Sequence, residues 1–203
     1  MASAFSYARR ISLKAENKRE GMDMKKTPVL LAMAAALLLG GCANKNEARF
    51  RDFSDGLRDR GDLTVTAEVR AEYDERSCSF TLRCTEDADG CTVEVIEPEL
   101  IRGVKARMSA DGAQLVYDSV AVDTGDDGGT GLSPMGALPL LLRTLREGAL
   151  DSAWKENGST AVRLVPEDDI AVTVLFDADM KPETAEIEHD GKGVLFLDIT
   201  EFS

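Results

Sequence analysis

The sequence predicts an α+β domain in which a strongly curved antiparallel sheet is wrapped over two or three helices. One helical pattern lies near the N-terminus, a second lies in the middle, and runs of period-two alternation follow each of them. Strands joined by short turns pair antiparallel, and a sheet with one apolar face needs helices to cover that face. About ten strands against so few helices imply a sheet that curves around them.

A secretory signal precedes this domain. Residues 25–42 read KKTPVLLAMAAALLLGGC, which is two lysines, an apolar run, two glycines and a cysteine. The apolar run is well short of the roughly 20 residues that a membrane-spanning helix needs. Leu39, Gly40 and Gly41 before Cys42 resemble the lipobox of bacterial lipoproteins. We expect cleavage after Gly41 and a diacylglyceryl thioether on Cys42. The alternative is an ordinary signal peptide that Cys42 merely closes.

The signal divides the chain into four segments. Residues 1–21 are expected to be an upstream extension without function, because Met22 and Met24 are both plausible starts, although a long n-region is the alternative. Residues 22–41 form the signal peptide, 42–46 a polar tether, and 47–203 one domain of ordinary size.

The mature chain is strongly acidic. Residues 1–41 hold seven of the 24 basic and three of the 37 acidic residues, which leaves 17 basic and 34 acidic side chains and a formal charge of -17. Nucleic-acid binding needs clustered Lys and Arg, so this class of partner is excluded. Anionic headgroups would repel the chain unless an anchor held it at the membrane. A solubilising surface is the simpler explanation of the charge.

The first elements of the domain have clear periods. Phe50, Phe53 and Leu57 predict a helix over residues 47–60, which Gly61 should end. From Leu63 to Tyr73 apolar and polar residues alternate, which predicts a strand with one buried face.

Three cysteines follow in a predicted hairpin. Folding the chain at residues 87–90 would place Cys84 opposite Cys91, with Leu82 opposite Val93 and Phe80 opposite Val95. We therefore predict a Cys84–Cys91 disulfide, which an exported protein permits, with Cys78 left as a thiol. The alternative is three reduced cysteines in a weakly oxidising host. Pro98 should end the second strand, because proline lacks a ladder donor.

The rest of the chain predicts strands around a central helix. Short strands are expected at 104–108, 113–118 and 119–123, with a turn at Asp111-Gly112, and the glycine-rich stretch 125–131 predicts a loop. Ser133 to Gly148 predicts a helix that Pro139 should kink unless it marks the first turn. A second short helical piece should hold Trp154. Four strands then follow, at 160–165, 170–176, 184–189 and 194–202, with Asp190-Gly191 as a tight turn.

Catalytic and metal sites are hard to assemble from these residues. His189 is the one histidine, it lies beside a predicted turn, and no G-x-S-x-G motif precedes a helix. The cysteines lack zinc spacing, and residues 85–96 lack the first and last ligands of a calcium loop. Asp126 and Asp127 could hold a cation weakly, although a solvated turn fits them better. We expect no enzyme activity, no metal and no cofactor.

The order of the elements resembles the LolA-like group of bacterial lipoproteins, which is related to outer-membrane lipoprotein-sorting proteins. The resemblance covers residues 47–203 and includes the runs VEVIEPELIRGVKARMSADGAQLVYDSVAVDTG and LSPMGALPLLLRTLREG. The matching features are the Glu97-Pro98 strand end, the Gly103 turn, the Asp111-Gly112 and Asp190-Gly191 hairpins, Leu115, Tyr117 and the helix at 133–148. The resemblance implies an incomplete antiparallel barrel around a helical plug.

In that group, the apolar space between barrel and plug takes acyl chains or another hydrophobic ligand. The central helix carries a stripe of four leucines, Leu138, Leu141, Leu142 and Leu145. The simpler prediction is that this stripe belongs to the core, but the central helix is also the plug and therefore faces the apolar space. The resemblance therefore implies that a ligand would lie near six side chains: Val65, Val69, Phe80, Leu82, Leu138 and Leu142.

Two functions agree with these features. The first is a non-catalytic lipoprotein, anchored through Cys42 on the outside of the cell membrane or on an outer membrane, that binds a lipid, a lipoprotein acyl chain or another apolar ligand. The second is a structural or regulatory lipoprotein, as in envelope or GerS-type spore-germination processes, that binds a protein partner and has no ligand cavity. The lipobox argues against a freely diffusing carrier, because such a carrier is not lipidated.

Overall fold

A computed structural model describes residues 44–73, 76–87, 90–109, 112–118, 120–125, 132–147 and 149–203. The chain divides into two compact units, Met1–Cys42 and Ala43–Ser203, and every described residue belongs to the second. The predicted extension 1–21, the signal peptide 22–41 with Leu39, Gly40 and Gly41, and the lipidation site Cys42 lie outside the described residues. Of the predicted loop 125–131, Gly125 ends a strand and residues 126–131 lie outside the described residues.

The described residues form one open antiparallel sheet of eleven strands, with the order β6-β5-β4-β3-β2-β1-β11-β10-β9-β8-β7. Every pair of neighbouring strands is antiparallel. The strands are β1 Leu63–Tyr73, β2 Arg76–Asp87, β3 Gly90–Glu97, β4 Lys105–Ser109, β5 Gly112–Tyr117, β6 Val120–Gly125, β7 Leu150–Glu156, β8 Ser159–Glu167, β9 Ile170–Phe176, β10 Pro182–His189 and β11 Lys192–Phe202.

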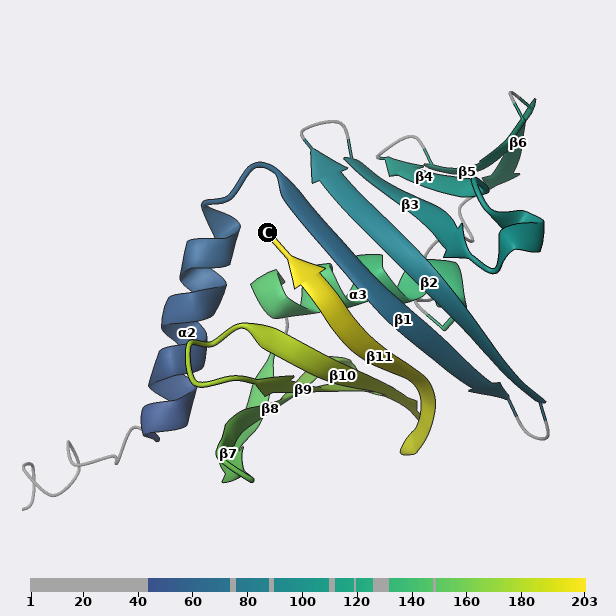
Figure 1. Ribbon diagram of the computed structural model, residues 1–203. Coiled ribbons are helices and arrows are strands. Elements are labelled where there is room, and N and C mark those ends of the chain that lie inside the picture. The colour runs from purple at the N-terminus through teal and green to yellow at the C-terminus, as the bar shows by residue number, and fades with distance from the viewer. Residues whose placement is uncertain are drawn as a thin grey trace, which may run out of the picture. The chain divides into compact units, whose positions relative to one another are not determined.

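Two α-helices cover part of one face of this sheet (Figure 1). Helix α3, Pro134–Glu147, packs on β1, β2, β3 and β8, and α2, Lys45–Arg58, packs on α3, β7 and β8. A single 3-10 turn, η1 Glu99–Ile101, joins β3 to β4. The Ser133 hydroxyl accepts a hydrogen bond from the Gly136 amide at 3.2 Å and so caps α3. Pro139 lies inside α3, where it removes one backbone hydrogen bond.

The core lies between the helices and the sheet. All four leucines of the predicted α3 stripe are buried, and on α2 the Phe53 ring packs edge-on against Phe176 at 5.1 Å between centroids. The largest fully buried side chains are Phe176, Leu57, Leu63, Leu82, Leu138, Leu141, Leu142, Leu145, Leu164, Ile187, Leu195 and Leu197. This open antiparallel sheet, with helices packed on one face, is the α+β architecture that was predicted, so the predicted fold class is confirmed.

Three details of the prediction are wrong. Trp154 lies in strand β7, not in a helix, because the segment pairs with β8 and Trp154 lies opposite Ala161. Helix α2 begins at Lys45, inside the predicted tether, because the Asn44 side chain accepts a hydrogen bond from the Asn46 amide and caps the helix there.

The third wrong detail is the register of the cysteine hairpin. Asp87 pairs with Gly90, so Cys84 lies opposite Val93 and Cys91 lies opposite Glu86. The predicted register is therefore displaced by two residues. Side chains alternate with a period of two, so this displacement keeps every residue on its predicted face while changing its partner.

Candidate ligand-binding surface

The six predicted ligand residues gather in the helix-covered part of the sheet. Val65, Val69, Leu82, Leu138 and Leu142 are buried in one hydrophobic cluster, and Phe80 packs against it while remaining partly exposed. Val69 lies opposite Phe80 in the β1–β2 pair. In this structure these side chains form core, and their role as ligand contacts stays a prediction.

One row of paired residues connects this core to the outer edge of the sheet. Residues that lie directly opposite one another in an antiparallel ladder project from the same face. Successive pairings carry the row across six strands, through Val65, Cys84, Val93, Ala106, Leu115 and Val122. All six side chains are therefore on the face that α3 covers at the β1 end.

Exposure is zero from Val65 through Cys84 to Val93 and rises from Ala106 outward. Val65 is fully buried, Ala106 is 8% exposed, Leu115 is 40% exposed and Val122 is 54% exposed. The cause is the helix cover, because α3 packs on β1, β2 and β3, whereas β4, β5 and β6 extend past it in Figure 1. We call β4, β5 and β6 the arm. We call the face of the arm that carries Ala106, Leu115 and Val122 its inner face, because this face continues the core.

The inner face of the arm is apolar. Tyr117 and Val120 face each other across β5 and β6 beside the row and are 51% and 62% exposed. Leu115, Tyr117, Val120 and Val122 are therefore four large exposed apolar side chains on adjacent strands. Charged side chains of β4, such as Lys105 and Arg107, project from the opposite face by strand alternation. Contiguous exposed apolar surface of this kind is typical of an interaction site.

A second cluster lies where the arm joins the covered part of the sheet. The Sγ atoms of Cys84 and Cys91 are 2.8 Å apart, and the three described cysteines are free thiols. Glu86, opposite Cys91, accepts a hydrogen bond of 2.5 Å from Arg146 near the end of α3. The Arg146 carbonyl in turn accepts hydrogen bonds from Ser54 and Arg58 of α2. The end of α3 is therefore tied to β2 beside the two thiols, and the end of α2 is tied to α3.

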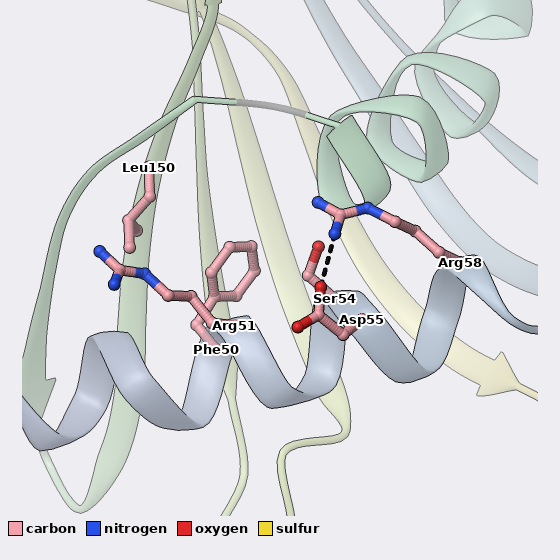
Figure 2. Close-up of a pocket in the computed structure, with 6 residues that line it drawn as sticks. All are labelled: Phe50, Arg51, Ser54, Asp55, Arg58 and Leu150. Carbon is pink, nitrogen blue, oxygen red and sulfur yellow. Dashed lines mark hydrogen bonds and ion pairs between the residues drawn. The ribbon is translucent and has the colours of Figure 1, made fainter.

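A groove of about 300 Å³ runs along α2 (Figure 2). Its polar groups already have partners in the protein, since Arg58 pairs with Asp55 at 2.5 Å and Ser54 donates to the Arg146 carbonyl. The Arg58–Asp55 pair lies within α2, whereas the bond from Ser54 joins α2 to α3, which indicates a structural role for the groove. Its lining residues are Phe50, Arg51, Ser54, Asp55, Arg58 and Leu150.

The structure assembles no catalytic or metal centre within its described part. His189 lies near the surface with its Nε2 atom 3.3 Å from the Asp169 carboxylate, at the end of β10. No group of three metal-ligating side chains occurs among the described residues. In the same ranges, every helix is too short or too polar to cross a membrane.

The exposed residues of the inner face were not predicted as a site. The sequence predicts Leu115 and Tyr117 only as features of the fold, and Val120 and Val122 only as members of the strand at 119–123. Their alternation is the available signal, with Leu115 and Tyr117 on one face of β5. Alternation predicts which residues share a face, but it does not predict where a helix stops covering that face.

Comparisons with known proteins give likenesses of fold only. No protein-family model and no curated protein matches the chain. A putative outer membrane lipoprotein-sorting protein domain from Vibrio parahaemolyticus superposes with a TM-score of 0.45 at 13% identity, over 76% of this chain and 90% of that one. A LolA superfamily protein from Nitrosomonas europaea superposes with a TM-score of 0.45 at 12% identity, over 77% and 92%. The Mycobacterium tuberculosis lipoprotein LppX superposes with a TM-score of 0.40 at 13% identity, over 76% of this chain and 93% of that one. These low scores carry no inference about a ligand.

Proposed function

We propose that this chain is a lipid-anchored, extracytoplasmic and non-catalytic protein that binds an acyl chain of a lipid or lipoprotein on the inner face of its arm. The row from buried Val65 to exposed Val122 carries this proposal. A surface that continues the core without its helix cover offers apolar contact at little cost, because its described exposed side chains are apolar except for the Tyr117 hydroxyl.

The chemistry of the inner face favours an acyl chain over a charged segment. The exposed side chains are Leu115, Val120, Val122 and Tyr117, and the Tyr117 hydroxyl is the polar group among them. Fully burying a Val or Leu side chain contributes roughly 1.5 to 3 kcal/mol, so covering these half-exposed side chains contributes about 1 kcal/mol each. An acyl chain gains this contribution along its length, whereas the described side chains of the inner face offer an ionic partner no counter-charge.

Native mass spectrometry of the compact unit Ala43–Ser203 tests the ligand. We expect a fraction of the purified protein to carry a lipid or fatty acid that is lost on denaturation. Protein that never carries a lipid, and that does not take up an added fatty acid, would contradict the proposal. A lipid-free dimer or protein complex would instead favour the alternative of a partner-binding lipoprotein, for which the edge strand β6 is available.

The anchor is proposed from Leu39, Gly40, Gly41 and Cys42. The folded unit begins with the helix cap at Asn44, two residues after Cys42, so an anchor there would hold the domain close to the membrane. Two acyl chains would make that attachment stable.

Labelling cells with an alkyne fatty acid tests this chemistry. The wild type and a Cys78→Ala control should incorporate the label, and Cys42→Ala should not. A Cys42→Ala protein that is labelled as strongly as the wild type would exclude Cys42 as the lipidated residue.

A further inference from the structure

We propose that Cys84 and Cys91 form an intrachain disulfide by exchange with an external disulfide, and that Cys91 is the thiol that reacts first. The two Sγ atoms are 2.8 Å apart on the inner face of the β2–β3 hairpin. Formation of this bridge requires no lipid ligand, because it involves only the two thiols and an external disulfide.

The pair is diagonal across the two strands. Cys84 lies opposite Val93, and Cys91 lies opposite Glu86, one step along the same face. Diagonal neighbours in an antiparallel pair lie farther apart than direct partners, so the observed 2.8 Å between the sulfurs, not the register alone, places these two short side chains in contact. A disulfide bond is about 2.0 Å long, so the sulfurs need to approach by less than about 1 Å more. Cys78 lies on the same strand as Cys84, roughly 20 Å away at six extended residues, and cannot join it.

The two thiols differ in accessibility. The Cys84 side chain is fully buried, whereas Cys91 is partly exposed. The hydrogen bond with Cys91 and burial both raise the pKa of Cys84, which keeps Cys84 in its protonated, unreactive form. An external disulfide therefore meets Cys91 before it can meet Cys84.

The reaction is two successive exchanges. The Cys91 thiolate attacks one sulfur of the external disulfide, forms a mixed disulfide and releases the first external thiolate. Cys84 then attacks the Cys91 sulfur and releases the second external thiolate, which takes up the Cys84 proton. Two protein thiols are oxidised by two electrons, and one external disulfide is reduced to two thiols.

The position of the bridge gives it a mechanical consequence. Cys91 also lies opposite Met108 on β4, so the bridge would form at the strand that carries the arm. On the other side, the Glu86–Arg146 pair ties β2 to α3. The disulfide would therefore brace the arm against the helix-covered part of the sheet.

Peptide mapping of the purified full chain tests the bridge. The chain is incubated with oxidised glutathione, remaining thiols are alkylated, and the protein is digested with trypsin. Cleavage at Arg76, Arg83 and Arg102 places Cys78 in one peptide and both Cys84 and Cys91 in another. We expect the 84–102 peptide without alkylation and two hydrogen atoms lighter than its reduced form. Alkylation of both of its cysteines, or a link to Cys78, would overturn the proposal.

Two serine variants test the order of reaction. Cys84→Ser should accumulate a mixed disulfide with glutathione at Cys91, because the second exchange is blocked. Cys91→Ser should leave the buried Cys84 reduced. A mixed disulfide that forms on Cys84 as fast as on Cys91 would refute Cys91 as the first thiol, while Cys78→Ser should leave the bridge intact.

Discussion

The helix-covered part of the sheet and the arm share the same alternation of apolar and polar residues along their strands. The apolar residues form core in the covered part, whereas they lie at the surface in the arm. In β1 the alternating residues Val65, Ala67 and Val69 are fully buried, whereas Leu115 of β5 and Val122 of β6 are half-exposed on the same face. The difference is the cover that α3 supplies. In a large curved sheet, the area that the helices cover therefore decides which part of the apolar face remains available to a ligand.

The largest effect is expected in the covered part. Leu138 is fully buried in α3, and its replacement by alanine should lower the free energy of unfolding by roughly 2 to 5 kcal/mol, because the change leaves a cavity that the packed core fills incompletely. Urea unfolding followed by circular dichroism measures this. A loss below about 1 kcal/mol would show that the site already contains space, which would weaken the contrast with the arm.

An intermediate effect is expected at the ion pair between β8 and β10. Arg163 donates two hydrogen bonds of 2.8 Å to Glu188, and this bonding lowers the pKa of Glu188 despite its burial. Glu188→Gln should therefore cost about 1 kcal/mol at pH 7. A lowered carboxyl pKa adds stability above the unfolded value of about 4.3, and this stability is lost as the pH falls toward the folded value.

The pH dependence supplies the control for this pair. The stability difference between wild type and Glu188→Gln should shrink as the pH is lowered below about 4. Glu183→Gln, on the same strand, should cost less at every pH, because the hydrogen bond that Glu183 accepts from Ser159 is 3.5 Å long and comes from an uncharged donor. A difference that does not change with pH would mean that the Glu188 charge contributes nothing.

The smallest effect on stability is expected in the arm. Leu115→Ala removes a side chain that is already 40% exposed, so the free energy of unfolding should change by less than about 1 kcal/mol. The same urea experiment compares it directly with Leu138→Ala. A loss as large as that of Leu138→Ala would place Leu115 in the core and contradict the exposed inner face.

Much of the fold could be predicted because its elements have strong local periods. The alternation from Leu63 to Tyr73 gives β1 with its observed ends, and the leucine stripe with Ser133 gives α3. Trp154 was misassigned because an edge strand of seven residues is too short for its alternation to be distinguished from a helical turn.

The site was predicted only in part, for a physical reason. Local pattern gives the face of each strand, so Val65, Leu82 and Cys84 were placed correctly on one face. Their burial depends on tertiary cover, and the Cys84–Cys91 register depends on a turn that moves partners by two residues without changing faces. Neither property is encoded in a single strand, so the exposed end of the row could not be located from sequence.

The most direct test of a ligand site on the inner face compares two aspartates placed on opposite faces of β6. Val122 projects from the inner face and Ala121 from the outer face, and both are exposed, so Val122→Asp and Ala121→Asp differ mainly in the side on which the charge stands. The measurement is the affinity of the compact unit Ala43–Ser203 for a fluorescent fatty acid. Val122→Asp should weaken binding by about tenfold or more, equivalent to at least about 1.4 kcal/mol, because an acyl chain would desolvate the carboxylate, while Ala121→Asp should bind as the wild type does. Equal binding by both variants, or an equal loss in both, would contradict a ligand site on the inner face.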